Sequence, residues 1–156
     1  MKLYMEKLNA DVARDILSWR YEQPYDFYNN EQTPEAISEM LADSYFSVFD
    51  DNKELVGFFC TGSSAQVPNE SYTYSQEFID IGLGMRPELT GQGNGILFFT
   101  AVLSQIDSMV GKSSKRLTVA KFNDRAIQLY GKLGFSREAE FVKGSTVFIV
   151  MVKVEA

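Results

Sequence analysis

The segment Pro87-Glu88-Leu89-Thr90-Gly91-Gln92-Gly93-Asn94-Gly95-Ile96-Leu97-Phe98-Phe99 alternates three glycines with polar residues and ends in an apolar run. A strand-like pattern over 77–85 precedes the glycines, and apolar residues at helical spacing follow over 96–110. The N-terminus of a helix exposes unpaired N–H groups, and glycines let a phosphate come within hydrogen-bonding distance of them. The segment therefore favours a pyrophosphate cradle over the alternative, a glycine-rich turn that binds no ligand.

Two familiar phosphate-binding motifs do not fit this chain. A Walker loop needs a glycine five positions before Gly-Lys-Ser/Thr, and Ile106 stands there before Gly111-Lys112-Ser113. A dinucleotide-binding domain of the Rossmann type needs G-x-G-x-x-G at its first strand–helix turn. Here the three glycines alternate strictly and follow several predicted strands, so the dinucleotide-binding domain is the less favoured alternative.

Periodicity and capping signals along the rest of the chain predict alternating strands and helices. Strand patterns cover 2–8, 45–50, 54–63, 77–85, 116–120, 138–143 and 146–154. Helix patterns cover 9–19, 33–42, 96–110 and 123–133. Asn9, Thr33 and Asn123 are the predicted N-cap residues of three of them, and Gly134-Phe135 is a predicted glycine stop after the last. The order βααβββαβαββ predicts an α/β (α+β) fold, a mixed sheet with helices on both faces. No linker divides it, so we expect a single domain over residues 1–156.

Two motifs resemble signatures of the GNAT N-acetyltransferase superfamily. Thr90 to Gly95 resembles the family's Q/R-x-x-G-x-G/A, with Thr90 at the Gln/Arg position, and Met85-Arg86-Pro87 resembles the V-x-P before it. Val119 to Phe135 contains N-x-x-A-x-x-x-Y-x-x-x-G-F and resembles the second family motif nearly throughout. The spacing of the motifs and the element order over the full chain also fit. The resemblance implies a GNAT-like fold, whose central, mostly antiparallel sheet is splayed after strand 4.

The resemblance also implies acetyl-coenzyme A (acetyl-CoA) as co-substrate, with its pyrophosphate on the glycine loop and its pantetheine arm paired like an extra strand. The implied cofactor-binding residues are Leu83, Gly84, Met85, Gly91, Gln92, Gly93, Asn94, Gly95, Ile96, Asn123 and Tyr130. Tyr130 occupies the family's proton-donor position; the alternative is a tyrosine packed in the core. The simplest group to meet the thioester oxygen is a main-chain N–H, for which Met85 is our candidate.

The sequence contains no histidine and one cysteine, Cys60. Ser-His and Cys-His nucleophile pairs and His-based zinc sites are therefore excluded, and we expect no metal. The candidate general bases are Asp80 and Glu77, which strand alternation would place on opposite faces; a water chain to solvent is the alternative. Cys60 lies mid-strand, and the chain has no histidine to activate it, which favours direct transfer over an acetyl-cysteine intermediate.

The acceptor is expected near the aromatic residues between the first two helices. Trp19, Tyr21, Tyr25 and Tyr28 are the candidate substrate-binding residues, with Phe27, Asp26 and Glu22 nearby. They predict an aromatic, acidic pocket for a cationic amine; the alternative is an aromatic core under a long loop. Residues 1–80 hold 15 acidic and 5 basic residues, and residues 81–156 hold 6 and 10. This asymmetry favours an anionic coenzyme in the second part and a cationic group in the first, unless both are simply solvated faces.

These features predict an acetyl-CoA-dependent N-acetyltransferase, an acyltransferase acting on a small-molecule or peptide amine acceptor. A non-catalytic domain that binds and senses acyl-CoA is the alternative. No basic patch interleaved with aromatics is present, so no nucleic acid partner is expected. Neither a signal peptide nor a span of about 18 apolar residues is found, which predicts no membrane association and a cytoplasmic location. Both a monomer and a homodimer are compatible with the sequence.

Overall fold

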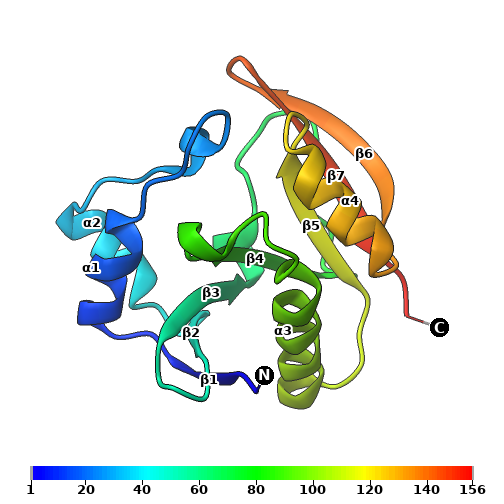
Figure 1. Cartoon of the computed structure of the whole chain (residues 1–156). Coiled ribbons are helices and arrows are strands. Elements are labelled where there is room, and N and C mark those ends of the chain that lie inside the picture. Colours follow the sequence, from blue (N-terminus) through cyan, green and yellow to red (C-terminus); the bar gives the residue numbers. More distant parts are fainter. Residues whose placement is uncertain (1, 156) are drawn as a thin grey trace. The chain divides into compact units, whose positions relative to one another are not determined.

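The computed structural model describes residues 2–155 (Figure 1). The elements follow in the order β1 (Tyr4–Lys7), α1 (Ala10–Ser18), η1 (Tyr25–Tyr28), α2 (Pro34–Met40), β2 (Tyr45–Phe49), β3 (Leu55–Thr61), η2 (Gly62–Ala65), β4 (Ile79–Met85), η3 (Pro87–Leu89), α3 (Gly95–Val110), β5 (Lys115–Ala120), α4 (Asp124–Lys132), β6 (Ser136–Lys143) and β7 (Thr146–Lys153). The η elements are short 3₁₀ helices. This order confirms the predicted succession of strands and helices.

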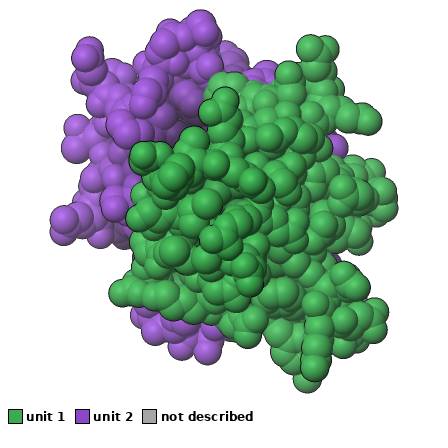
Figure 2. Space-filling model, turned by 90° about the vertical axis from the view of Figure 1, so that its left-hand side faces the viewer, with its two compact units in different colours: residues 1–60, 83–94 green, residues 61–82, 95–156 purple. Residues whose placement is uncertain are grey.

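The chain forms two compact units, coloured separately in Figure 2. Unit 1 consists of Met1–Cys60 and Leu83–Asn94, and unit 2 consists of Thr61–Gly82 and Gly95–Ala156. The chain passes from unit 2 to unit 1 within β4 and returns to unit 2 where α3 begins. Each unit therefore contains residues far apart in the sequence, and the single domain over residues 1–156 stays a prediction.

The strands form a mixed, mostly antiparallel sheet of order β1-β2-β3-β4-β5-β7-β6. In unit 1, β2 pairs antiparallel with β1 and with β3. In unit 2, β7 lies antiparallel between β5 and β6, and β5 pairs in parallel with the beginning of β4. A parallel neighbour needs a crossover connection, which α3 supplies here. The predicted mixed, mostly antiparallel sheet is confirmed.

The parallel ladder between β4 and β5 is short. It pairs Ile79–Ile81 with Lys115–Leu117, all in unit 2. Leu83–Met85, the part of β4 that the resemblance assigns to the coenzyme, belongs to unit 1. The splay after this strand concerns the arrangement of the two units and stays a prediction.

Local capping sets where the helices begin. The side-chain oxygens of three predicted N-cap residues accept backbone N–H groups: Asn9 from Val12 at 2.9 Å, Thr33 from Ala36 at 3.1 Å and Asn123 from Ala126 at 3.1 Å. Each satisfies a donor that the first helical turn leaves unpaired. These bonds confirm the predicted caps. The caps could be predicted from the sequence because each bond joins residues three positions apart.

The predicted glycine stop of α4 is also confirmed. Gly134 has φ 98°, a left-handed conformation that glycine adopts without steric strain. The Phe135 N–H donates to the Tyr130 carbonyl at 3.0 Å, and the two rings lie 6.4 Å apart. This hydrogen bond and its apolar contact are those of a Schellman motif.

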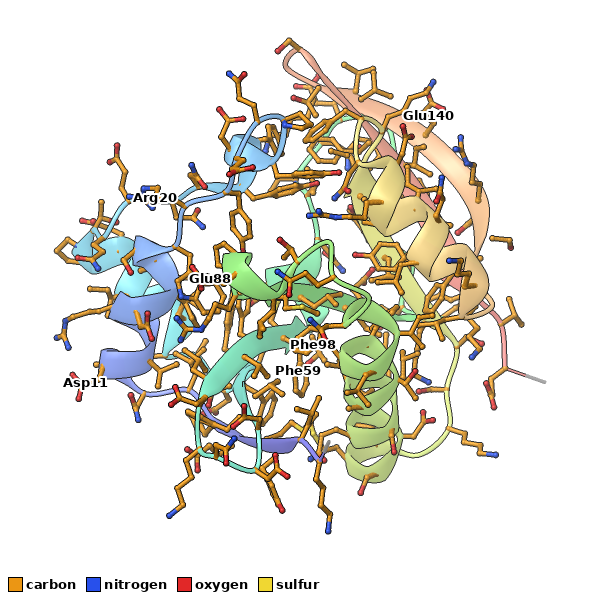
Figure 3. The ribbon with its side chains drawn as sticks, in the orientation of Figure 1. Asp11, Arg20, Phe59, Glu88, Phe98 and Glu140 are labelled. Carbon is orange, nitrogen blue, oxygen red and sulfur yellow. The ribbon has the colours of Figure 1, made fainter. Side chains whose placement is uncertain are left out.

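Each unit has its own apolar interior. In unit 1 the buried side chains include Ala13, Ile16, Leu17, Val48, Leu55 and Phe59; in unit 2 they include Ile81, Phe98, Phe99, Val102, Ile106, Leu117, Ile149 and Val150. Phe59 and Phe98, labelled in Figure 3, are 0% and 3% exposed. Within residues 2–155, none of the helices is both long and apolar enough to cross a bilayer.

Candidate functional site

The glycine loop begins after η3 and ends at Gly95, where α3 starts. Gly91 has φ 70° and Gly93 has φ 81°, conformations that residues with a side chain rarely adopt. A Cβ built at Gly93 would meet no heavy atom within 4 Å, and the residue is exposed. The loop thus presents uncovered backbone directly before a 16-residue helix, an arrangement suited to binding phosphate.

Side chains of the loop fasten its own backbone. Three of them donate to carbonyl oxygens of the preceding turn: Thr90 to Pro87 at 2.7 Å, Gln92 to Glu88 at 2.8 Å and Asn94 to Leu89 at 3.0 Å. Glu88 is labelled on this turn in Figure 3. These bonds hold the loop in shape before any ligand arrives, which lowers the entropy that binding would remove. The Thr90 hydroxyl thereby takes a structural part at the position where the family has Gln or Arg.

In unit 2, α3 packs closely against α4 at its first residue. A Cβ added to Gly95 would lie 3.1 Å from a methyl group of Leu129, which is tighter than nine in ten real Cβ contacts. Gly95 therefore serves helix packing, a reason the sequence did not reveal. Ile96 and Leu97, the next residues of α3, are 47% and 40% exposed and leave apolar surface beside the loop.

Tyr130 lies on the buried side of α4. It is 9% exposed, and its ring centroid lies 5.2 Å from that of Phe99 in an edge-on arrangement. Phe99 follows Gly95 by four residues, about one helical turn. The structure therefore brings Tyr130 close to the start of α3 within unit 2, while Asn123 caps the same helix that carries Tyr130.

In unit 1, the end of β4 is held by residues from both sides. The Arg86 N–H donates to the Val56 carbonyl of β3 at 2.9 Å, and the Met85 carbonyl accepts the Tyr21 hydroxyl at 2.7 Å. A Cβ at Gly84 would overlap the ring of Phe58. The absence of a side chain at Gly84 makes room for the Phe58 ring, and its part in binding the pantetheine arm stays a prediction.

Asp80 lies in a buried ion pair. Its two carboxylate oxygens accept Nε and Nη2 of Arg116 at 2.6 and 2.8 Å, and one also accepts the Gln66 amide at 2.9 Å. Asp80 is 4% exposed and Arg116 is fully buried. Hydrogen bonding to Asp80 raises the pKa of Arg116 above its usual range although burial opposes the charge. A carboxylate so fully occupied is poorly placed to accept a proton from an amine.

Aromatic rings surround the same guanidinium. Its central carbon lies 4.9 Å from the Tyr74 ring centroid, 5.3 Å from that of Phe78 and 5.9 Å from that of Tyr72. Nη2 of Arg116 also donates to the Ser75 carbonyl at 2.8 Å. The cluster fastens the segment before β4 onto β5. Sequence reasoning missed this role of Arg116, for which a charged residue at the start of a predicted buried strand was the available signal.

Glu77 does not lie on β4. The strand begins at Ile79, and Glu77 is an exposed residue of the preceding turn. The predicted strand began two residues too early, so the expectation that Glu77 and Asp80 alternate across one strand is wrong.

The four predicted acceptor residues have different environments in unit 1. Trp19 is 6% exposed, its indole N–H donates to Asp15 at 3.2 Å, and Arg86 lies 5.3 Å over its ring. Trp19 is therefore buried in unit 1, and its part in acceptor binding stays a prediction. Tyr21, Tyr25 and Tyr28 are half-buried along the loop that contains η1.

The predicted site residues divide between the units. Unit 1 holds the acceptor loop (residues 19–33, between α1 and α2), Leu83–Met85 and the glycine loop to Asn94. Unit 2 holds Glu77, Asp80, Gly95, Ile96, Asn123 and Tyr130. Among residues 2–155 no group of three or more acidic, histidine or cysteine side chains is arranged to hold a metal.

Several solved structures share the fold. A chimera of spermidine N-acetyltransferase SpeG from Vibrio cholerae with hSSAT is 20% identical, with a TM-score of 0.71 and 99% of this chain and 96% of that chain covered. A Bordetella pertussis protein described as a GNAT-family acetyltransferase is 14% identical, with a TM-score of 0.76 and 97% and 95% covered. A protein described as a phosphinothricin N-acetyltransferase is 14% identical, with a TM-score of 0.69 and 99% of both chains covered.

No curated protein sequence matches the chain. The model of the acetyltransferase (GNAT) family matches residues 12–135. That range includes the glycine loop, Asn123 and Tyr130, and the solved structures above agree with it in fold. The chain belongs to the GNAT acetyltransferase family.

Proposed function

We propose that this protein is an acetyl-CoA-dependent N-acetyltransferase that moves an acetyl group directly to a primary amine. The observation that carries the proposal is the uncovered glycine loop before α3, in a chain of the GNAT family. Its acceptor is a small molecule or a peptide amine. A cytoplasmic location and a monomeric or homodimeric state belong to the same proposal.

The coenzyme would bind mainly through backbone groups. Gly91, Gly93 and the first residues of α3 offer N–H groups to the pyrophosphate, and the positive end of the helix dipole favours its charge. Leu83 and Met85 offer the edge of β4 to the pantetheine amides. The family resemblance assigns Asn123 and Tyr130 of unit 2 to the coenzyme as well.

The reaction joins the amine nitrogen to the thioester carbonyl carbon and breaks the carbon–sulfur bond. The ammonium must first lose a proton, since only its neutral form carries the attacking electron pair. The Met85 N–H is our candidate to stabilise the developing oxyanion. The leaving thiolate takes a proton from the Tyr130 hydroxyl, which regains one from solvent, and the nitrogen releases its second proton to solvent as the amide forms. The products are an amide and coenzyme A (CoA).

The general base must accept a proton from the ammonium group, and Asp80, Glu77 and water are the candidates. The Arg116 pair gives Asp80 a structural part, so Glu77 and water leading to solvent become the preferred proton acceptors. Glu77 is exposed, which suits exchange of a proton with bulk water.

The acceptor loop is suited to a cation. Tyr25 and Tyr28 lie on it beside exposed Asp26 and Glu22, so aromatic faces and negative charge occur together. A cationic amine with an apolar spacer matches this combination. The V. cholerae chimera is a spermidine N-acetyltransferase by its description, which supports testing polyamines first.

A screen of primary amines with acetyl-CoA should detect release of the CoA thiol by a thiol-reactive dye. Polyamines, amino acids, aminoglycosides and peptide N-termini make up the panel. We expect amine-dependent thiol release, with formation of the acetylated amine confirmed by mass. A protein that binds acetyl-CoA tightly but releases no thiol with any amine would instead fit the acyl-CoA sensor.

Replacement of Gly93 by valine should weaken CoA binding by at least tenfold. The new side chain would cover the loop N–H groups and is strained at φ 81°. Calorimetric titration of the folded variant measures the change.

Gly111→Val is the matched control. Gly111 has φ 84°, also meets nothing within 4 Å, and follows the opposite end of α3. The two variants should lose similar stability, but only Gly93→Val should lose affinity. If both variants bind CoA with equal affinity, the assignment of the pyrophosphate to the glycine loop is wrong.

A further inference from the structure

The Tyr21 hydroxyl occupies the outer edge of β4 in unit 1. Arg86 directs its N–H to Val56 of β3. Successive residues of a strand direct their backbone polar groups to opposite sides, so those of Met85 face away from β3. There the Met85 carbonyl accepts the Tyr21 hydroxyl at 2.7 Å.

An added strand would use this same carbonyl. Paired strands lie about 4.7–4.9 Å apart and are joined by N–H to carbonyl bonds of about 2.9 Å. The Tyr21 oxygen, 2.7 Å from the Met85 carbonyl, stands where an amide nitrogen of the added strand would stand. A pantetheine arm that pairs along Leu83–Met85 must therefore compete with Tyr21.

Tyr21 is also tied into the acceptor loop. Its N–H donates to the side-chain oxygen of Asn29 at 2.7 Å, and the Asn29 N–H donates to the Asp26 carbonyl at 3.0 Å. Tyr25 and Tyr28 lie within the segment that these bonds close. A displacement of Tyr21 would therefore be transmitted to the proposed acceptor residues.

The chain directly before Tyr21 is anchored to α1. Arg20, labelled in Figure 3, donates to the Leu17 and Trp19 carbonyls at 3.1 and 2.7 Å. Trp19 is held by Asp15 and by Arg86 over its ring. Movement of the loop would thus begin at Tyr21 and leave Trp19 in place.

We infer that Tyr21 is a latch that the coenzyme opens, an inference that rests on the proposed function. The Tyr21 hydroxyl binds the Met85 carbonyl, and its backbone holds the acceptor loop. Pantetheine pairing takes over that carbonyl and releases the loop to receive the amine. Tyr21 is then a positioning residue, and the coenzyme binds before the acceptor.

Tyr21→Phe tests the latch with CoA as the probe and needs no acceptor. The variant keeps the ring and removes one hydrogen bond that CoA otherwise has to displace. We expect it to bind CoA about two- to tenfold more tightly than the wild type, the range of one net hydrogen bond. Calorimetry gives the affinity, and emission of Trp19, the only tryptophan, gives an independent titration.

Hydrogen exchange of the loop amides supplies the second measurement. In the wild type, CoA should speed exchange at Tyr21 and Asn29. In Tyr21→Phe these amides should exchange faster without CoA, and CoA should add little. Tyr4→Phe, which removes a hydroxyl from a half-exposed residue of β1, should match the wild type in both measurements.

The outcomes separate the latch from the proposed function. Equal or weaker CoA binding by Tyr21→Phe, with normal binding by the wild type, overturns the latch alone. It would mean that pantetheine and Tyr21 share the carbonyl or that the arm runs elsewhere. No CoA binding by the wild type overturns the proposed function and the latch together.

Discussion

A Tyr130→Phe enzyme is expected to turn over about 100- to 10,000-fold more slowly than the wild type, the usual range for loss of a general acid. The lower part of the range is the more fitting, because a thiol with an ordinary pKa of about 8.5 can leave as thiolate at neutral pH. The ring should keep its packing against Phe99, since only the hydroxyl is removed. Steady-state kinetics with an identified amine measures the change.

The binding constants distinguish an acid from a packing residue. Because the hydroxyl acts as charge builds on sulfur, kcat should fall while the KM for acetyl-CoA and the affinity for CoA stay near the wild-type values. A folded Tyr130→Phe protein that turns over at the wild-type rate would show the hydroxyl to be structural. Water or the proton released from the amine would then reprotonate the thiolate.

Asp80→Ala is expected to lower the free energy of unfolding by about 3–5 kcal/mol, the usual effect of breaking a buried ion pair. The variant leaves the guanidinium of Arg116, which is 0% exposed, without its carboxylate among three aromatic rings. Urea denaturation followed by circular dichroism and by Trp19 emission measures the loss.

Two comparisons test the cause of that loss. Glu140→Ala breaks the half-exposed pair with Lys121 (Glu140 is labelled in Figure 3) and should change stability by less than about 1 kcal/mol. The double variant Asp80→Leu with Arg116→Met removes both charges and should recover much of the stability. If Asp80→Ala unfolds like the wild type, the ion pair contributes little to the fold.

The milder variant Asp80→Asn distinguishes a structural role of Asp80 from a role as general base. It keeps the size of the side chain and one acceptor oxygen for Arg116. If Asp80 only holds the segment before β4, the folded fraction of Asp80→Asn should retain most of the wild-type kcat. A loss of kcat by more than about 100-fold in a fully folded variant would return Asp80 to the role of general base.

The elements, their caps and the family could be predicted because each depends on residues close together in the chain. Asn9, Thr33 and Asn123 cap helices through a backbone N–H three residues later, and Gly134 ends α4 within one turn. The glycine loop likewise carries its own conformation. Such features depend on residue spacing and side-chain chemistry alone, so they can be predicted without knowledge of the tertiary structure.

Contacts between distant residues were decided only by the tertiary structure. Tyr21 meets Met85 across 64 residues, and Arg116 meets Asp80 across 36. Which partners meet depends on strand order, register and the paths of the loops, and no local pattern specifies these. The sequence by itself therefore determined the strands and helices, the glycine loop and the family. The tertiary structure decided that Asp80 is committed to an ion pair, that Trp19 is buried, and that the Tyr21 hydroxyl binds the Met85 carbonyl.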